Sequence, residues 1–112
     1  MRVIFAEGED ERTLRAAQLS VDEGIAYPVL VGRDYAIKER IRSRGLRIEQ
    51  GQDFEIVQGV SHHQHRDLEL EYYDLMSRRG VTMAMAKEEM RARPTLIAAM
   101  HVRRGYADAM LC

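Results

Sequence analysis

The residues best placed to do chemistry lie in one short segment near the N-terminus, Glu7-Gly-Glu-Asp-Glu-Arg12. Its glycine turn precedes a predicted helix, and a turn of this kind can bind an anion through backbone N–H groups. With a single glycine and acidic neighbours, it matches neither the dinucleotide fingerprint nor the phosphate loop with its lysine. Two interpretations stay open: the acidic side chains cap the helix and offset its dipole, or they hold a ligand or a neighbouring domain.

Four histidines are the candidates for metal chemistry. Three of them, His62, His63 and His65, lie in a predicted polar loop, residues 58–66, with no cysteine or patterned carboxylate pair nearby to complete a zinc site. The fourth, His101, falls on a predicted helix among charged residues. We therefore expect solvated histidines and no metal site in this chain.

Two arginine pairs, Arg78-Arg79 and Arg103-Arg104, fall in the last turns of predicted helices. Cations at that position offset the negative end of the helix dipole; the alternative is that they bind an anion. Asp108 is unusual because it lies inside an apolar run. It either faces a strand edge or orients a site in a part of the domain beyond this chain.

Apolar runs and helical periodicity place these residues on alternating elements. Apolar runs predict strands at residues 3–6, 27–32, 54–57 and 107–112; the first is expected to be covered on both faces, and the second and fourth to be buried. Helical spacing predicts helices at about 11–23, 35–44, 67–79, 82–90 and 94–104, and residues 46–53 can add a short edge. The buried face of the third helix is expected to carry Leu68, Tyr72, Leu75 and Met76. Strands that alternate with helices predict an α/β fold, a three-layer αβα sandwich with a mostly parallel sheet.

Glycine, threonine and proline mark the ends of the predicted helices. Glycines that accept the left-handed conformation end four of them: Gly24, Gly45, Gly80 and Gly105. Thr82 is a plausible N-cap, and Pro94 can open a helix. Residues 23–31 and 104–112 share a helix end, a glycine, a large apolar residue, an alanine and a strand. We therefore predict that the same helix-to-strand turn is used twice.

The predicted sheet indicates where a ligand would bind. In an open α/β sheet, ligands bind beyond the carboxyl ends of the strands. Those ends are Glu7-Gly8, Gly32-Arg33, Gln58-Gly59 and whatever follows Cys112. The candidate ligand-facing residues are Glu7, Gly8, Asp10, Arg12, Gly32 and Arg33. Because no helix follows the fourth strand to cover it, we expect residues 1–112 to be part of a larger, single domain.

Composition limits the class of protein. A chain of 112 residues, 46% hydrophobic and 31% charged, is typical of one soluble domain. No segment is apolar and long enough to span a bilayer and no secretory signal begins the chain, so we expect a cytoplasmic protein with no membrane partner. The single cysteine, Cys112, forms no internal disulfide. A net charge of −1 argues against nucleic acid as a partner.

Four segments in order carry a resemblance to a known family: V-I-F-A-E-G-E-D-E-R-T-L-R-A-A, V-L-V-G-R, Y-Y-D-L-M-S-R-R-G-V-T and R-R-G-Y-A-D-A-M-L-C. They are similar to phosphotransacetylases, the phosphate acetyl/butyryl transferases, and most of all to the version fused at the C-terminus of bacterial NADP-dependent malic enzymes. The resemblance implies the first part of a two-lobed, isocitrate/isopropylmalate dehydrogenase-like α/β domain. Coenzyme A and acyl phosphate would bind between its lobes.

One residue departs from the pattern of active transferases. The family places an arginine directly after a Tyr-acidic-Leu triplet, and here Tyr73-Asp-Leu75 is followed by Met76. A thioether cannot replace a guanidinium that grips phosphate in bidentate fashion. The resemblance therefore implies no catalytic residue in this chain and a regulatory, oligomer-forming part of a malic enzyme that senses acetyl-CoA while the enzyme decarboxylates malate to pyruvate.

Other consequences and alternatives follow from the resemblance. It implies a homo-oligomer whose small-molecule partner is of the acetyl-CoA class, with no cofactor held by this chain; NADP and a divalent metal would belong to malic-enzyme domains outside it. The first alternative is the N-terminal lobe of a working phosphate acetyltransferase, with Met76 a tolerated change. The second is a free-standing binding domain. For the isolated chain we expect at most weak binding of acetyl-CoA.

Overall fold

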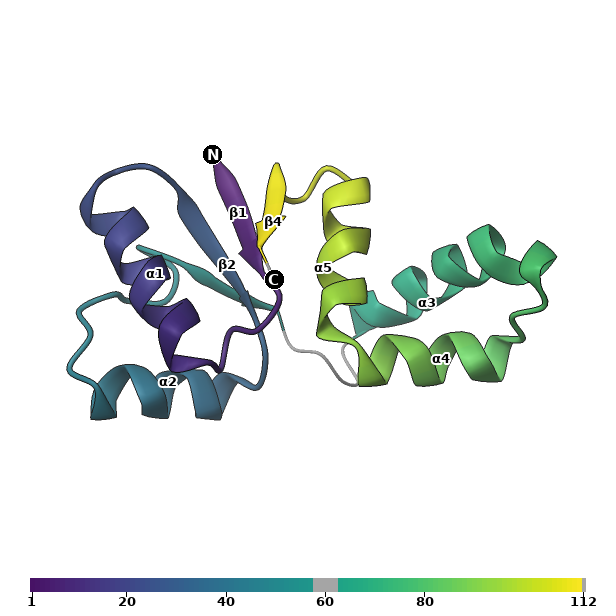
Figure 1. Cartoon of the computed structure of the whole chain (residues 1–112), viewed down its shortest axis with the longest axis horizontal. Helices are drawn as coiled ribbons and strands as arrows, with labels where there is room; N and C mark the ends of the chain where they lie inside the picture. Colours follow the sequence, from purple (N-terminus) through teal and green to yellow (C-terminus); the bar gives the residue numbers. More distant parts are fainter. Residues whose placement is uncertain (58–62, 112) are drawn as a thin grey trace.

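The computed structural model describes the backbone of residues 1–57 and 63–111, and the side chains of these residues except 63–65. In this part of the chain, four strands form one parallel sheet in the order β3-β2-β1-β4 (Figure 1). The strands are β1 (Arg2–Phe5), β2 (Tyr27–Val31), β3 (Glu55–Val57) and β4 (Ala109–Leu111).

Helices cover both faces of this sheet. They are α1 (Glu11–Asp22), α2 (Asp34–Ser43), α3 (His63–Met76), α4 (Met83–Ala92) and α5 (Pro94–Arg103), with the short 3₁₀ helix η1 (Ser77–Arg79) after α3. Figure 1 shows α1 and α2 on one face, and α5 with the α3–α4 hairpin on the other. The predicted three-layer αβα sandwich with a parallel sheet is confirmed.

Two separate apolar cores explain why the strand sequences do not alternate. Successive side chains of a strand point to opposite faces. Val3 and Phe5 therefore pack toward α1 and α2, whereas Ile4 packs toward α3, α4 and α5. The first core comprises Val3, Phe5, Leu14, Ala17, Leu30, Ile37, Ile41, Ile48 and Phe54. The second comprises Ile4, Ala6, Val29, Val31, Leu68, Tyr72, Ala86, Met90, Ile97, Ala98, Met100 and Ala107.

The predicted helix-to-strand turn is present at both places, and a third helix, α2, ends with the same turn before a loop. Gly24 and Gly105 both have positive φ, and the residue after each, Ile25 or Tyr106, donates its backbone N–H to a carbonyl five residues earlier. Leu46 makes the same bond after Gly45, which also has positive φ. This pattern is the Schellman motif, in which a left-handed glycine satisfies the last helical carbonyls.

The α3–α4 hairpin has the caps that its sequence predicts. Gly80 is left-handed after η1, the Thr82 hydroxyl accepts from the Met85 N–H at 3.2 Å, and Pro94 opens α5. The hairpin extends away from the sheet (Figure 1), and the molecule measures 45 × 25 × 21 Å. The radius of gyration of the whole molecule, 14.5 Å, exceeds the roughly 13 Å of a compact chain of this length because the hairpin extends outward.

Several expectations about individual segments are wrong. α3 begins at His63, so residues 63–66 are helical rather than a loop, because no glycine or proline interrupts them; residues 58–62, with His62, lie outside the described part. Residues 46–53 form no strand, and Ile48 packs into the first core instead. Leu75 is 44% exposed and belongs to neither core, whereas the adjacent Met76 packs against the second core.

The fourth strand is shorter and less buried than predicted. It spans Ala109–Leu111, and Leu111 is 55% exposed. Only β1 pairs with it, so its outer edge has no neighbour among the described residues. Asp108 lies just before β4, where its carboxylate accepts from the Arg2 N–H at 2.8 Å and its own N–H donates to the Arg2 carbonyl at 2.8 Å. The strand-edge interpretation of Asp108 is therefore the one that the structure supports.

Candidate functional site

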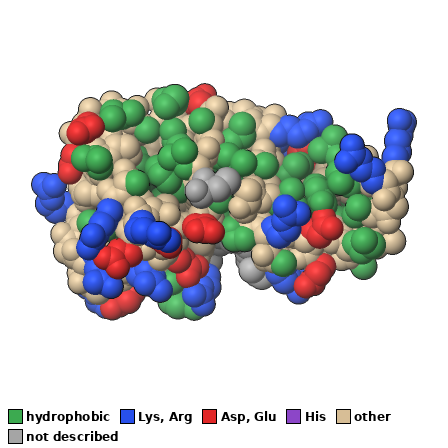
Figure 2. Space-filling view, in the orientation of Figure 1, with side chains coloured by type: hydrophobic (Ala, Val, Ile, Leu, Met, Phe, Trp, Pro, Cys, Tyr) green, Lys and Arg blue, Asp and Glu red, His purple; other side chains and the backbone are tan. Residues whose placement is uncertain are grey.

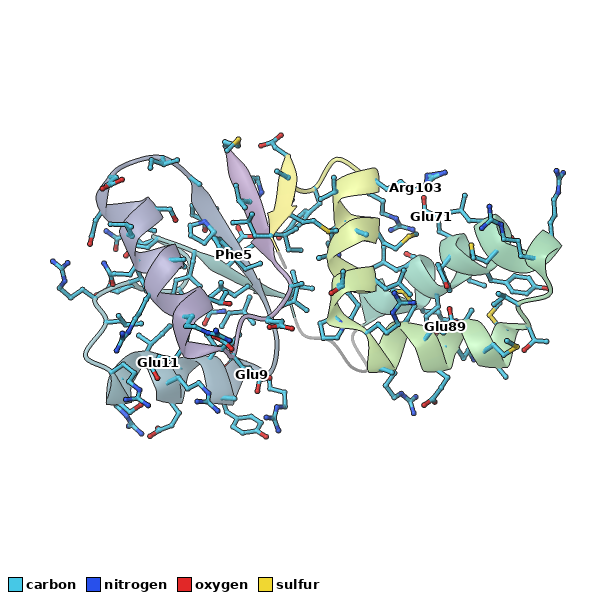
Figure 3. The ribbon with its side chains drawn as sticks, in the orientation of Figure 1. Phe5, Glu9, Glu11, Glu71, Glu89 and Arg103 are labelled. Carbon is cyan, nitrogen blue, oxygen red and sulfur yellow. The ribbon has the colours of Figure 1, made fainter. Side chains whose placement is uncertain are left out.

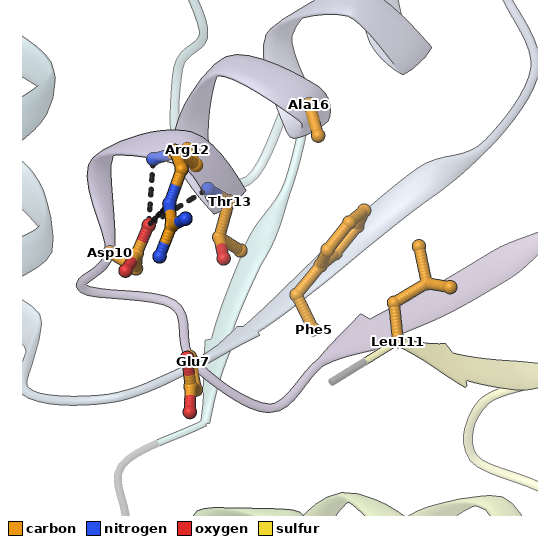
Figure 4. Close-up of a pocket in the computed structure, with 7 residues that line it drawn as sticks. All are labelled: Phe5, Glu7, Asp10, Arg12, Thr13, Ala16 and Leu111. Atoms are coloured by element: carbon orange, nitrogen blue, oxygen red, sulfur yellow. Dashed lines mark hydrogen bonds and ion pairs between the residues drawn. The ribbon is translucent and has the colours of Figure 1, made fainter.

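The carboxyl ends of β1 and β4 border a pocket of about 400 Å³ (Figure 4). Its lining comprises Phe5, Glu7, Asp10, Arg12, Thr13, Ala16 and Leu111. Phe5 and Leu111 give it an apolar floor, and α1 forms one wall. Its rim is net acidic, because Glu7 and Asp10 outnumber Arg12. Three of the six predicted ligand-facing residues, Glu7, Asp10 and Arg12, thus share one pocket.

Asp10 caps the helix that forms this wall. Its Oδ1 accepts from the backbone N–H groups of Arg12 at 2.8 Å and Thr13 at 3.4 Å (Figure 4). The hydrogen bond from the Arg12 N–H is the main cause that holds the pKa of Asp10 below its ordinary value. Of the two interpretations of the acidic segment, the capping one therefore describes Asp10. An anion at this helix end would have to displace the Asp10 carboxylate.

Gly8 is required by a close approach of two backbones. Its N–H donates to the Val31 carbonyl at 2.9 Å, which joins the β1–α1 loop to the end of β2. A Cβ at this position would lie 2.7 Å from that carbonyl oxygen and 2.9 Å from the Leu30 Cβ. Both distances are shorter than van der Waals contact, so only glycine fits. Gly8 is buried and does not line the pocket.

Arg33 is not part of the pocket lining and is bound instead by Glu9. The Glu9 carboxylate accepts from Arg33 Nη2 at 2.7 Å, from Nε at 3.1 Å and from the Arg33 backbone N–H at 2.9 Å. These guanidinium bonds hold the pKa of Glu9 below its usual range against the opposing effect of burial, and they raise the pKa of Arg33. Figure 3 shows Glu9 at the loop that precedes α1.

Glu9 is the site residue that the sequence reasoning missed. A signal was available: Glu9 follows β1 and Arg33 follows β2, and the carboxyl ends of adjacent parallel strands meet at one edge of a sheet. Gly32 belongs to the same arrangement, because a Cβ there would lie 2.9 Å from the Glu9 Cγ. Gly32 and Arg33 therefore contact Glu9 and are not part of the pocket lining.

Met76 is remote from this pocket. It ends α3, at the outer end of the hairpin in Figure 1, and it is half-buried against the second core. The pocket lies on the other face of the sheet, beside α1. Within the described residues, the chain does not bring the departure at position 76 together with the ligand-facing candidates.

His101 is buried, which corrects the expectation of a solvated side chain. It is 6% exposed, its Nδ1 lies 2.8 Å from the Ile97 carbonyl oxygen, and its ring meets the Tyr106 ring edge-on at 5.3 Å. Burial lowers its pKa and favours the neutral imidazole. Its spacing could have shown this, since it lies four residues after Ile97 and so on the buried face of α5.

The arginine pair after His101 has an intramolecular partner. Arg103 Nη1 and Arg104 Nε lie 3.4 Å and 2.7 Å from the Glu71 carboxylate, which joins α5 to α3 (Figure 3). Arg104 also borders a second pocket of about 290 Å³, together with Asp67, Leu68, His101 and Tyr106. Arg78 and Arg79, by contrast, are exposed at the end of η1.

The opposite edge of the sheet, where the strands begin, carries a polar network. Arg2 Nη2 lies 2.7 Å from Glu55, and the Tyr106 hydroxyl donates to the same carboxylate. The bond from Tyr106 is the main cause that lowers the pKa of Glu55. The Arg2 guanidinium also lies over the rings of Tyr27 and Tyr106. This network joins β1, β3 and the turn before β4, so its role is structural.

Neither a metal site nor a membrane-spanning helix is present in the described part of the chain. Among the side chains that the structure describes, those of residues 1–57 and 66–111, no group of three His, Cys, Asp or Glu is placed to hold a metal ion. No helix in the same part of the chain is long and apolar enough to cross a membrane. Figure 2 shows acidic and basic side chains intermixed over α1 and α2.

Comparison with known proteins identifies the family. The model of the phosphate acetyl/butaryl transferase family matches residues 1–112, so the chain belongs to this family. A solved phosphotransacetylase from Streptococcus pyogenes superposes with a TM-score of 0.83 at 26% identity, covering 98% of this chain and 32% of that one. The fold expected from the resemblance is confirmed.

Curated relatives include two kinds of enzyme. The NAD-dependent malic enzyme of Rhizobium meliloti is 48% identical over 111 residues, and the NADP-dependent malic enzyme of Escherichia coli is 45% identical over 111 residues. Both alignments cover 99% of this chain but only 14% and 15% of those enzymes. The phosphate acetyltransferase of Clostridium acetobutylicum is 34% identical over 110 residues, which cover 98% of this chain and 32% of that protein. The chain thus spans at most about a third of these relatives.

Proposed function

We propose that this chain is part of the phosphotransacetylase-like domain of a malic enzyme, and that the domain senses acetyl-CoA without transferring the acetyl group. The similarity supports a domain of this kind or a phosphate acetyltransferase. The observation that favours the first is the higher identity to malic enzymes, 48% and 45%, than to the acetyltransferase, 34%.

Met76 supports a domain without transferase activity. The resemblance to active transferases places an arginine at this position, where it would hold phosphate. The Met76 side chain is half-buried against the second core, and a thioether offers no charged donor to an anion. A domain with methionine in place of this arginine can keep its fold, because the methionine side chain packs against the core. The same domain would no longer bind phosphate through a guanidinium at this position.

The pocket beside α1 is consistent with this proposal, because it is poorly suited to a bare phosphate. Its rim carries Glu7 and Asp10, and Asp10 already occupies the N–H groups at the helix end. Arg12, whose side chain is 92% exposed, lies 3.6 Å from Asp10. The apolar floor formed by Phe5 and Leu111 suits an uncharged part of a ligand. We assign no catalytic step to these residues.

The proposal extends to the whole polypeptide. Its malic-enzyme part would use NADP, or NAD as the name of the Rhizobium relative indicates for that protein, together with a divalent metal. Acetyl-CoA bound to the phosphotransacetylase-like part would change the rate of malate decarboxylation, in a cytoplasmic homo-oligomer. In this chain the partner is a small molecule, and neither a membrane nor nucleic acid is involved.

Calorimetry with acetyl-CoA on the full polypeptide tests the proposal, combined with an assay of acetyl transfer to phosphate. The wild type is expected to bind acetyl-CoA, to change its rate of malate oxidation on binding, and to transfer no acetyl group. Met76→Arg introduces the family's guanidinium. Met85→Arg is the matched control, because Met85 is a 47% exposed methionine on α4.

The outcomes separate the two kinds of protein. Acetyl transfer by the wild type at an ordinary enzymatic rate would show a working phosphate acetyltransferase and overturn the sensor. A wild type that neither binds acetyl-CoA nor changes its malate oxidation would also refute it. Weak transfer that appears in Met76→Arg but not in Met85→Arg would assign the lost chemistry to position 76.

A further inference from the structure

Glu9 and Arg33 join two loops at the carboxyl edge of the sheet. The three hydrogen bonds between them, at 2.7, 2.9 and 3.1 Å, include both the guanidinium and the backbone N–H of Arg33. Glu9 lies between Gly8 and Asp10 in the β1–α1 loop, and Arg33 is the last residue of the β2–α2 connection, directly before α2. The two loops are 24 residues apart in sequence. We call this pair of residues the clamp.

Two glycines make room for the clamp. The absence of a side chain at Gly32 lets the Glu9 Cγ pass within 2.9 Å of the place where a Cβ would be. Gly8 brings the same loop against β2 through its N–H bond to the Val31 carbonyl. Tyr35 adds to the arrangement, because its hydroxyl accepts from Arg33 Nη1 at 2.8 Å and its ring lies 5.3 Å from the guanidinium carbon. The guanidinium thus donates to both Glu9 and Tyr35, while the Arg33 side chain is 60% exposed.

We infer that the clamp positions the β1–α1 loop, so that Glu7 and Asp10 stand at the rim of the pocket, and that Arg33 is a positioning residue and not an anion ligand. This inference rests on the proposed function in one respect: acetyl-CoA is taken as the ligand. Its measured affinity then depends on the position of the loop. The geometry carries it, because the planar guanidinium meets both carboxylate oxygens of Glu9 in the bidentate arrangement that arginine favours.

The two roles of Arg33 predict opposite effects of one substitution. If Arg33 bound an anionic group of the ligand, Glu9 would compete with that group, and Glu9→Gln would raise the affinity. If Arg33 positions the loop, Glu9→Gln weakens the clamp and lowers the affinity, as Arg33→Met does. Gln keeps the shape of Glu and still accepts from the Arg33 N–H. The sign of the change therefore distinguishes the roles.

The first experiment measures the affinity for acetyl-CoA by calorimetry on the full polypeptide. We expect Glu9→Gln and Arg33→Met each to weaken binding by about fivefold, in the range of a single exposed ion pair. The double variant should be no weaker than Arg33→Met, because both changes break the same contact. Arg47→Met is the matched control: Arg47 forms an ion pair of 3.0 Å with Asp22 at the other end of α1.

The second experiment follows amide hydrogen exchange of residues 6–10 in the same variants, without ligand. Glu9→Gln and Arg33→Met should speed exchange at Gly8 and Asp10 severalfold, since the Gly8 N–H donates to the Val31 carbonyl of β2 and the Asp10 N–H donates to the Glu7 carbonyl within the loop. Arg47→Met should leave these amides unchanged.

Each result decides between the alternatives. Higher affinity in Glu9→Gln would show an anion ligand and overturn the inference, and so would unchanged exchange at residues 6–10 in both clamp variants. A wild type that binds no acetyl-CoA would refute the proposed function alone, because the exchange of residues 6–10 would still confirm or refute the clamp.

Discussion

At the carboxyl edge of the sheet, the β1–α1 loop is held from three directions, whereas at the outer end of the α3–α4 hairpin the chain contacts little beyond itself. The loop is fixed by Gly8 against β2, by Glu9 against Arg33 and by Asp10 against α1. On the hairpin, Leu68 is 1% exposed, Tyr72 7% and Met90 2%, whereas Leu75 and Met85, farther from the sheet, are 44% and 47% exposed.

The β1–α1 loop and the outer end of the hairpin thus differ in how their residues are held: the first by contacts with other segments, the second mainly by the helices themselves. The loop's position depends on hydrogen bonds between segments distant in sequence. The hairpin depends on one buried layer near the sheet, formed by Leu68, Tyr72, Ala86 and Met90, and on its caps. Substitutions at the loop and in the hairpin should therefore differ in their cost.

The largest expected effect is loss of the buried layer of the hairpin. Leu68→Ala should lower the free energy of unfolding by about 3 kcal/mol, because it leaves a cavity in the second core. Leu75→Ala, the same change at an exposed leucine of the same helix, should cost less than about 0.5 kcal/mol. Urea denaturation of both variants gives the comparison. Equal losses would mean that the outer end is packed as tightly as the base.

A smaller loss is expected at the carboxyl edge from Gly8→Ala. The added Cβ would meet the Val31 carbonyl oxygen at 2.7 Å, and moving two backbones apart should cost about 2 kcal/mol. Gly24→Ala is the control, since a Cβ there meets nothing within 4 Å and only its φ of +66° is unfavourable, at about 1 kcal/mol. Denaturation midpoints measure both changes. A milder effect at Gly8 than at Gly24 would show that the loop can move away from β2.

The caps of α1 and α4 can be compared directly. Thr82→Ala removes the bond to the Met85 N–H and should cost about 1 kcal/mol. Asp10→Ala should also destabilise the chain, whereas Asp10→Asn, which still accepts from the Arg12 N–H, should be milder. Hydrogen exchange in the first turn of each helix reports the local effect. If Asp10→Asn were as harmful as Asp10→Ala, the charge rather than the cap would be the important feature.

The smallest effect concerns pH and the buried His101. Because burial lowers its pKa in the folded state, the unfolded chain binds the proton more tightly. The contribution of neutral His101 to the free energy of unfolding is fully present above the pKa of histidine in the unfolded chain, about 6.5. It is lost as the pH falls through the lower pKa of His101 in the folded state. The charged and titratable groups around it are Arg104, Asp67 and Tyr106.

The measurement is the urea midpoint at pH 7.5 and 5.5 for the wild type and for His101→Gln. The wild type should lose stability on acidification, and the variant should lose less. The carboxyl groups of Glu9 and Glu55, whose pKa values are lowered in the folded state, do not interfere. Their contribution to the free energy of unfolding is lost only below about pH 4.5. An equal pH dependence in the two proteins would exclude His101 as its source.

Much of the fold could be predicted because its signals are local. The uninterrupted apolar run at residues 3–6, the glycine at each Schellman turn and Thr82 before α4 depend on residues close in sequence. The candidate site could be predicted in outline, since the carboxyl ends of parallel strands are known once the strands are. The start of α3 at His63 was missed because polar residues give little periodicity.

By itself, the sequence determined the order of the elements, the parallel sheet, the helix caps and the family, since these depend on short patterns and on similarity along the whole chain. Only the tertiary structure decided which atoms of Glu9 and Arg33 bond, what His101 contacts and how far Leu111 is exposed. Those facts arise where distant segments meet. Pattern along the chain tells which face a residue occupies, whereas its partner and its contact with water depend on what the fold brings to that face.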